Sequence, residues 1–141
     1  MEWNECIVFI LAKSQQKAQK EFKRLLAPFD LTPIQFLTLA LLATENGVSA
    51  AEICDRMMID KSTLSGVLER LEEKGLLTKK TDLQDRRALS IQLTDKAVEM
   101  GAQLAQIPET INKIILSPLS LEEQLLLKRM LVDIYSHTGG P

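Results

Sequence analysis

The stretch of sequence that decides the fold runs KSTLSGVLERLEEKG, from Lys61 to Gly75. Its apolar residues recur at intervals of three and four, which is the spacing of one buried face on a helix. These residues are Leu64, Val67, Leu68 and Leu71. Asp60 can cap the start of the helix, and Gly75 can end it in the left-handed conformation. The stretch therefore predicts a helix over residues 61–74 with a small, polar outer face near its start.

A shorter helix is predicted immediately before this one. The motif Ser49-Ala50-Ala51-Glu52 has the spacing of a capping box, and the inward residues after it would be Ile53, Cys54 and Met57. A brief turn at Met58-Ile59 separates this helix from the next. Two short capped helices joined by a tight turn are typical of a helix-turn-helix.

Two short strands are predicted after the second helix. Leu76 to Lys80 can form one strand, and Ala88 to Leu93 alternates apolar and polar residues as a half-buried strand does. The segment between them, Thr81 to Arg87, is polar and charged like a loop. A hairpin in this place makes the unit a winged helix-turn-helix.

Further helices are predicted on the N-terminal side of this unit. A stripe of apolar and small residues predicts a helix over residues 4–27, which Pro28 ends. The motif Thr32-Pro33-Ile34-Gln35 then combines an N-cap, a proline at the first helical position and a capping-box partner. It opens a helix that is expected to run to Asn46 and to end at Gly47.

On the C-terminal side, Thr94 or Asp95 is expected to cap a long helix that Pro108 kinks. A final helix, capped at Ser120, should reach about Tyr135. Its leucines cover more than one face, which a small domain cannot easily bury without a partner. The predicted fold is therefore mostly α with a small β-wing. A winged helix-turn-helix over residues 31–95 stands between dimerisation helices at residues 1–30 and 96–141.

The net charge of −2 and the pI of about 5.5 argue, taken alone, against binding to nucleic acid. The distribution of charge argues otherwise. Residues 61–87 contain seven basic and five acidic side chains, so this segment carries +2 and the rest of the chain carries −4. Positive charge is thus concentrated on the predicted recognition helix and wing.

Other classes of protein are disfavoured by what the sequence contains. The longest apolar run, residues 37–43, is too short to cross a bilayer, and the first residues do not resemble a secretory signal. No membrane contact and a cytoplasmic location are therefore expected. With Cys6, Cys54 and one histidine, His137, we expect no disulfide, metal site or cofactor. No nucleophile–base set or glycine-rich phosphate loop indicates an enzyme.

Small polar residues on the outer face of the helix at 61–74 are the first candidates for contact with DNA. The hydroxyls of Ser62, Thr63 and Ser65 can bond base edges or phosphates. Gly66 permits close approach of the backbone, and Lys61 adds charge near the helix start. The alternative is an ordinary solvated helix face.

The predicted loop of the hairpin supplies further candidates. It contains Asp85, Arg86 and Arg87, and arginine suits the strong negative potential of a narrow minor groove. The same arginines could instead form surface ion pairs with little effect on stability.

From Leu31 to Ala97 the chain resembles the MarR-type (multiple antibiotic resistance regulator) transcriptional regulators. The resemblance is carried by Leu31-Thr32, Gln35-Phe36, Lys61-Ser62-Thr63-Leu64-Ser65, Leu68-Glu69-Arg70-Leu71-Glu72-Glu73-Lys74-Gly75-Leu76, Asp82, Asp85-Arg86-Arg87 and Leu93-Thr94. Leu83 departs from the family pattern where a proline is usual. Met58 departs from it at a turn position that glycine often holds.

The resemblance implies a homodimer that binds a pseudo-palindromic operator in double-stranded DNA as a repressor. Recognition helices would enter successive major grooves and wings the adjacent minor grooves. Ser62, Thr63 and Ser65 would then meet the major groove, and Arg86 would be the wing-tip residue. The remaining roles are phosphate contact for Arg70 and Lys80 and bracing of the wing for Asp85 and Arg87.

The resemblance also implies a small aromatic or anionic effector, bound between the dimer helices and the winged domain. Two alternatives stay open. One branch of the family senses organic hydroperoxides through a cysteine in the first helix, although Cys6 stands slightly early for that role and the only tyrosine, Tyr135, is remote. The other alternative is a winged helix that contacts proteins only, because a fold does not fix a function.

Overall fold

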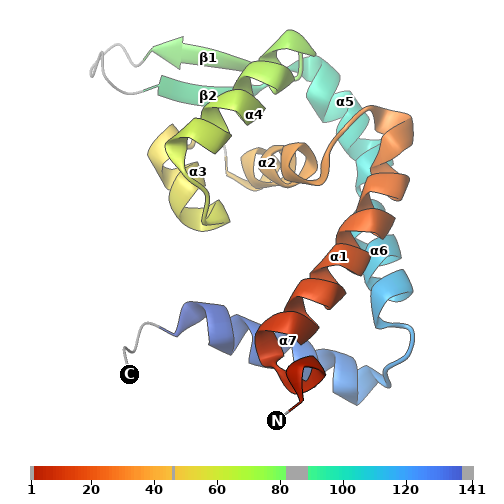
Figure 1. Cartoon of the computed structure of the whole chain (residues 1–141). Coiled ribbons are helices and arrows are strands. Elements are labelled where there is room, and N and C mark those ends of the chain that lie inside the picture. The colour runs from red at the N-terminus through yellow and green to blue at the C-terminus, as the bar shows by residue number, and fades with distance from the viewer. Residues whose placement is uncertain (1, 46, 82–88, 138–141) are drawn as a thin grey trace.

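A computed structural model describes residues 2–45, 47–81 and 89–137 of the chain. It is mostly helical, with one sheet of two antiparallel strands, which confirms the predicted fold class. The helices α2 (Pro33–Thr44), α3 (Ala50–Met57) and α4 (Lys61–Glu73) and the two strands form one compact unit. Helices α1 (Ile7–Leu26) and α6 (Ile107–Leu116) pack against each other and run from this unit toward α7 (Leu121–Ser136) (Figure 1).

The N-terminal segment is divided at Cys6, where a single helix over residues 4–27 was expected. A 3-10 turn, η1 (Trp3–Glu5), precedes helix α1 (Ile7–Leu26), and Cys6 between them has an extended backbone. The turn is closed by reciprocal capping of Glu2 and Glu5. After α1, a second 3-10 turn, η2 (Ala27–Phe29), contains the helix-ending Pro28.

Helix α2 (Pro33–Thr44) begins with the predicted capping box. The Gln35 backbone N–H donates to Thr32 Oγ1 at 3.3 Å, and the Thr32 N–H donates to Gln35 Oε1 at 3.1 Å. The helix ends two residues before the predicted position, because Glu45 is already extended. The predicted end, Asn46, lies outside the described residues. Gly47 has the expected positive φ, 76°.

The helix-turn-helix consists of α3 (Ala50–Met57) and α4 (Lys61–Glu73). Ser49 caps α3 by accepting from the Glu52 N–H at 3.2 Å, but the return bond of a capping box is not found between these two residues. In the turn, Met58 has a φ of 54°. This is the position at which the sequence departs from the pattern of the family that it resembles, and the backbone there has the conformation that glycine would adopt most easily.

The wing is a hairpin of β1 (Leu77–Thr81) and β2 (Leu89–Leu93). Its register pairs Leu77 with Leu93 and Thr81 with Leu89, so both predicted strands are confirmed to within one residue. The loop that joins them, residues 82–88, lies outside the described residues.

One apolar core joins these elements. Its most completely buried side chains come from the end of α1, from α2, α3 and α4, and from the hairpin. They are Leu26, Leu42, Ile53, Leu64, Leu71, Leu76, Leu77 and Ile91. The hydroxyl of Thr38, also buried, donates to the Ile34 carbonyl at 2.8 Å. The core fixes α4 and the hairpin relative to α2, so the outer face of α4 is presented by a rigid support.

The predicted long helix after the wing is two helices, α5 (Asp95–Leu104) and α6 (Ile107–Leu116). Pro108 has no N–H to donate to the Leu104 carbonyl, and its ring would clash with that carbonyl. The helix therefore ends at Leu104 and restarts with Pro108 in its first turn, which is a break rather than the expected kink. Ser120 and Glu123 form a capping box at the start of the last helix, α7 (Leu121–Ser136).

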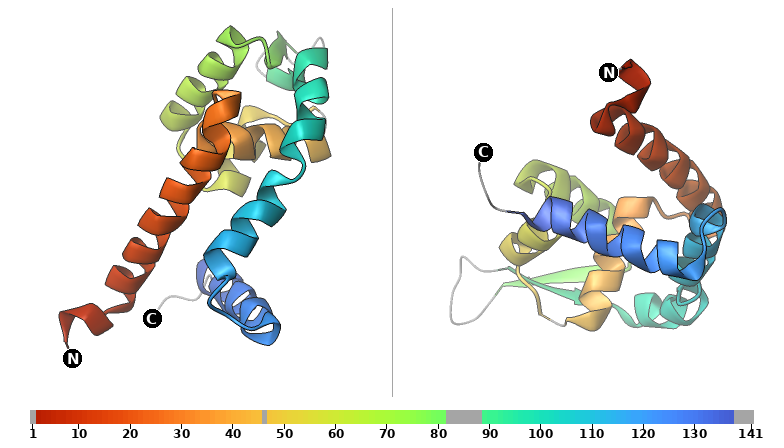
Figure 2. Two further views of the ribbon diagram at one scale, coloured as in Figure 1. Left: turned by 90° about the vertical axis from the view of Figure 1, so that its right-hand side faces the viewer. Right: turned by 90° about the horizontal axis from the view of Figure 1, so that it is seen from below.

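Helix α7 has no buried residue, and the N-terminal half of α1 is exposed as well. Figure 2 shows that α1, which packs against α6, separates from α6 and α7 toward its N-terminal end. Large apolar side chains are exposed on η1, α1 and α7. They are Trp3, Ile7, Val8, Ile10, Leu11, Leu121, Leu125, Leu126, Met130, Leu131, Val132, Ile134 and Tyr135.

Within the described residues, no single helix is long and apolar enough to cross a membrane. The helical segments Ile7–Phe29 and Pro33–Thr44 together reach the required length and hydropathy, but they are bent by 71° relative to each other. Within the same residues, no three histidine, cysteine, aspartate or glutamate side chains gather closely enough to hold a metal ion.

We predict that Met58→Gly raises the free energy of unfolding by about 0.5–1 kcal/mol. A non-glycine residue in the left-handed conformation destabilises the folded state by roughly 1–2 kcal/mol. Glycine removes this strain, but its greater conformational freedom in the unfolded chain offsets part of the gain in stability. Met58 is 69% exposed, so little packing is lost. Urea unfolding would measure the change. Met58→Ala is the control, since it removes the same side chain and keeps the strained backbone; an equal gain in this control would contradict the explanation.

Candidate nucleic-acid interface

Helix α4 separates its residues cleanly between core and solvent. Leu64, Val67, Leu68 and Leu71 are buried. Every residue of this helix that was predicted from the sequence to contact DNA is exposed. These residues are Lys61, Ser62, Thr63, Ser65, Gly66 and Arg70. The outer face of α4, defined by these six residues, is therefore available to a partner along more than two turns.

The start of α4 is fixed by Asp60. Its Oδ1 accepts from the Thr63 backbone N–H at 2.6 Å. This hydrogen bond, supported by the Thr63 hydroxyl, lowers the pKa of the Asp60 carboxyl below its ordinary value. The first turn of α4 contains no acidic residue and begins with Lys61. Lys61 and the partial positive charge of the helix N-terminus therefore offset the charge of the Asp60 carboxylate at the cap.

Gly66 is not required by packing inside the chain. A Cβ built at this position would meet no atom of the described residues within 4 Å, and the φ of Gly66 is not in the left-handed region. Glycine lowers helix stability by about 1 kcal/mol relative to alanine. Its presence in the middle of an exposed helix face is consistent with a partner that approaches the backbone closely.

Basic residues of the hairpin differ in their surroundings. Lys79 Nζ lies 3.7 Å from Glu72 Oε1, so this lysine is engaged with α4. Lys80, the next residue on β1, is exposed, and its side chain points to the opposite face of the hairpin. Asp85, Arg86 and Arg87 lie outside the described residues, so their roles stay predictions.

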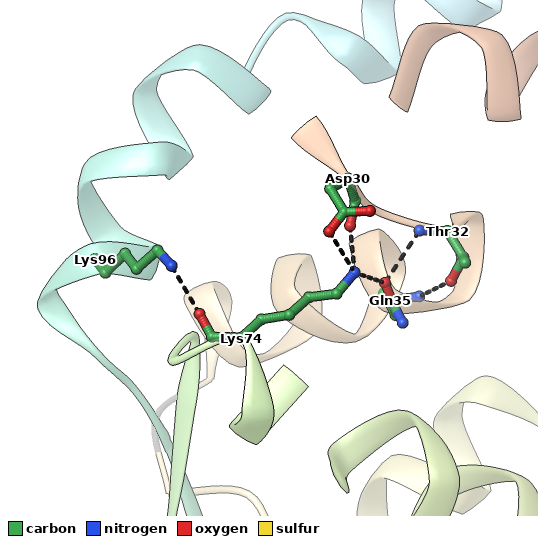
Figure 3. Close-up of polar contacts among 5 residues, drawn as sticks. All are labelled: Asp30, Thr32, Gln35, Lys74 and Lys96. Carbon is green, nitrogen blue, oxygen red and sulfur yellow. Dashed lines mark hydrogen bonds and ion pairs between the residues drawn. The ribbon is translucent and has the colours of Figure 1, made fainter. Parts of the chain in front are cut away.

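The C-terminal end of α4 is held by Lys74 (Figure 3). Lys74 Nζ donates to the Asp30 carbonyl and, at 3.2 Å, to Gln35 Oε1. The Asp30 carboxylate lies 3.6 Å from the same ammonium group. The Gln35 oxygen is the one that also accepts from Thr32, so the capping box of α2 and the end of α4 share an acceptor. Lys74 thereby ties α4 to the turn between α1 and α2.

The segment that enters α5 holds the same end of α4 from another side. Lys96 Nζ donates to the Lys74 carbonyl at 2.8 Å. Thr94 Oγ1 donates to the Gly75 carbonyl at 2.6 Å while capping α5. Sequence reasoning did not find this role of Lys74, because its partners Asp30 and Lys96 are 44 and 22 residues away and no local motif joins them.

A cavity of about 600 Å³ lies between α2 and α5. The side chains around it are mostly apolar, and among the described residues that line it Thr44 is the only one with a polar side chain. The lining residues are Phe36, Leu39, Ala40, Leu42, Ala43, Thr44, Leu93, Ala97, Val98, Gly101, Leu104, Ala105 and Pro108. A volume of this size is typical of sites for small organic ligands.

The two cysteines are free thiols and are both partly buried. Cys54 packs against the core from α3, as its sequence position predicted. Cys6 lies at the cap of α1 rather than inside a helix. Redox sensing through Cys6 stays an open alternative.

Comparison with known proteins identifies the family to which this chain is similar. The model of the MarR family matches residues 29–88. The organic hydroperoxide resistance transcriptional regulator of Bacillus subtilis is 30% identical over 111 residues, which cover 79% of this chain and 76% of that protein. The transcriptional repressor NicR of Pseudomonas putida is 27% identical over 138 residues, which cover 96% of this chain and 87% of the repressor.

Solved structures agree with the sequence relatives. The repressor CouR, in a structure bound to a 23-mer DNA duplex, matches with a TM-score of 0.87 and 28% identity, over 94% of each chain. All of these relatives are named as transcriptional regulators or repressors, which confirms the prediction that this type of protein is not an enzyme.

We predict that Asp60→Asn abolishes part of the pH dependence of stability. Because the folded-state pKa of Asp60 is lowered, its carboxylate stabilises the fold above the unfolded-state pKa, about 3.9, and this contribution is lost as the pH falls through the lower folded value. Asparagine caps a helix nearly as well but does not titrate. The natural chain should therefore exceed the variant in unfolding free energy at neutral pH, and the difference should vanish in strong acid.

Urea unfolding across this pH range would measure the difference. Asp55→Asn, an exposed carboxylate in the last turns of α3, controls for the change in net charge. A difference for Asp60→Asn that does not change with pH would contradict the assignment of the cap to the charged form.

Proposed function

This chain is a transcriptional regulator of the MarR family, and on that premise we propose that it binds a pseudo-palindromic operator as a homodimer and acts as a repressor. The observation that carries the proposal is the exposed outer face of α4 on a rigid core, followed directly by the β1–β2 hairpin. A helix of this kind enters the major groove in helix-turn-helix proteins, with its N-terminal residues at the base edges.

The residues proposed to read or hold DNA have different tasks. Ser62, Thr63 and Ser65 stand in the first turns of α4, where hydroxyls can reach base edges, and Lys61 adds charge at the same end. Arg70 and Lys80, both exposed, would contact phosphates. For the wing loop we propose contact of Arg86 with the minor groove and bracing by Asp85 and Arg87.

The proposal of a homodimer is supported by the apolar side chains on α7 and on the N-terminal half of α1. Leu125 is 63% exposed and Val132 is 45% exposed, one heptad apart on the same side of α7. A monomeric protein seldom leaves such a continuous apolar surface in water. Pairing of two chains through these helices would cover it and would place two copies of α4 on one side of the duplex.

The proposal of a repressor is supported by the relatives named as repressors, NicR and CouR. A repressor must be released from DNA to permit transcription, and a small effector could do this by binding between the dimer helices and the winged unit. The cavity between α2 and α5 lies at that border.

We predict that Lys80→Ala weakens binding to operator DNA. It should also make the negative slope of log affinity against log salt concentration shallower by about one. The operator would be selected from random or genomic duplexes, and fluorescence anisotropy would give the affinity at several salt concentrations. Lys79→Ala is the matched control, because this neighbouring lysine is already paired with Glu72.

The control should leave the salt slope close to that of the natural chain. Equal slopes for all three proteins would show that Lys80 does not contact phosphate. Binding that is insensitive to salt throughout would favour the alternative of a winged helix that contacts only proteins.

We predict that the double variant Leu125→Glu/Val132→Glu is monomeric and binds the operator roughly 100-fold more weakly, because two half-sites are no longer bound by one linked pair. Sedimentation velocity would give the oligomeric state and anisotropy the affinity. Lys128→Ala, on the same helix, is the control and should remain dimeric. A natural chain that sediments as a monomer yet binds the full operator tightly would overturn the proposed assembly.

A further inference from the structure

We propose that Lys74 is a positioning residue that sets the separation of the two α4 helices in the dimer. It thereby determines which spacing between operator half-sites the chain accepts. The inference rests on the proposed function, because it needs two copies of the chain on one duplex. Lys74 acts without touching DNA, by bracing the winged unit (α2, α3, α4 and the hairpin) against the helices that leave it.

The chain leaves the winged unit at two places, and bonds of Lys74 reach both. One place is the turn between α1 and α2, which supplies the Asp30 carbonyl as an acceptor for Lys74 Nζ. The other is the segment between β2 and α5, where Lys96 Nζ donates to the Lys74 carbonyl at 2.8 Å. Helix α5 leads into α6, which packs against α1 (Figure 1). Both attachments of Lys74 therefore lead to the helices that carry the proposed dimer surface.

The hold on the ammonium group depends on two of the three oxygens that surround it. An ammonium group has three N–H donors, and Lys74 Nζ lies near the Asp30 carbonyl, Gln35 Oε1 at 3.2 Å and Asp30 Oδ2 at 3.6 Å. The Asp30 side chain is 94% exposed, so water screens the attraction of its carboxylate. The Asp30 carbonyl and the buried Gln35 side chain are thus the acceptors that matter.

The backbone of Asp30 has a conformation that depends on its neighbours. Its φ is 53°, in the left-handed region that residues other than glycine seldom adopt. Such a residue persists only where surrounding contacts hold it in place. The Asp30 N–H donates to the Ala27 carbonyl at 3.1 Å, and its carbonyl accepts from Lys74. Lys74 is therefore bonded to a turn of defined conformation directly after α1.

The spacing of half-sites follows from this bracing. Apolar contact is non-directional and tolerates small rotations, whereas a hydrogen bond weakens when its angle changes. In a twofold dimer, equal rotations of the two winged units move the two α4 helices in opposite directions. Each base pair added between half-sites moves them about 3.4 Å apart and turns one by about 35° relative to the other. A braced unit should fit one spacing, and a loosened unit should accept several.

Pulsed electron paramagnetic resonance tests the bracing without DNA. A nitroxide attached at Glu69→Cys, an exposed position on α4, reports the distance between the two copies of α4 in the dimer. The native thiols are removed by Cys6→Ser and Cys54→Ala. The chain with Lys74 should give a narrow distribution of distances, and Lys74→Met should give one at least about twofold broader, because more arrangements become populated.

Lys79→Met is the matched control. The side chains of Lys79 and Lys74 are both 28% exposed, and Lys79 Nζ lies 3.7 Å from Glu72, but this pair joins α4 only to the neighbouring strand. The control should keep the narrow distribution. Gln35→Met removes the acceptor and should broaden the distribution as Lys74→Met does, with no further broadening in the double variant. Thermal unfolding would verify that each variant is folded.

The effect on DNA is measured by fluorescence anisotropy with the selected operator and with duplexes that have one base pair more or less between the half-sites. The natural chain and Lys79→Met should prefer the selected spacing at least about tenfold, and Lys74→Met about threefold or less. The affinity of Lys74→Met for a single half-site and its salt slope should equal those of the natural chain. A shallower slope would show that Lys74 contacts phosphate directly and would overturn the positioning role.

The remaining outcomes separate this inference from the proposed function. A narrow distribution in Lys74→Met, or an undiminished preference for one spacing, would overturn the inference alone. A natural chain without a dipolar signal is not a dimer, and this would refute the proposed assembly together with the inference. A dimer that binds none of the duplexes would refute the proposed function, whereas a broadened distribution in Lys74→Met would still support the bracing by Lys74.

Discussion

The ammonium group of Lys74 is the contact on which the geometry of the DNA-binding face depends. It lies at the C-terminal end of α4, where a positive charge also opposes the partial negative charge of the helix end. Around it gather the Asp30 carbonyl and carboxylate and the Gln35 side chain, while Lys96 bonds the backbone of the same residue. The hairpin begins three residues after Lys74, so the contacts of Lys74 set the direction in which the hairpin leaves α4. Helix α4, the turn before α2 and the start of α5 therefore cannot move independently.

The parts of the fold that the sequence predicted are those whose causes are local. Thr32 with Gln35, Asp60 with Thr63, and Ser120 with Glu123 each form a cap across three residues, so their spacing is visible in the sequence. The exposed face of α4 follows in the same way from the spacing of its leucines. Three features of the structure could not be predicted from the spacing of residues along the chain, because they depend on the three-dimensional arrangement of the backbone. They are the break before Pro108 where a kink was expected, the division of the first helix at Cys6, and the long-range partners of Lys74.

The acidic character of the chain and its proposed binding to DNA are compatible because the basic residues are not equivalent. Lys79 is paired with Glu72, and Lys74 is committed to the interior contacts of the winged unit. Lys61, Arg70 and Lys80 are exposed near the outer face of α4 and on the hairpin. A few exposed cations on a chain of net charge −2 attract DNA of any sequence only weakly. Discrimination between DNA sequences then depends on the contacts with the base edges.

The absence of any buried residue in α7 has a consequence for how much active protein a cell contains. Sixteen residues of helix gain little from their own chain, so in the proposed dimer their order comes from the second subunit. At low abundance, the amount of assembled regulator would then rise with the square of the chain concentration. A modest change in synthesis or degradation would translate into a steeper change in operator occupancy, without any ligand.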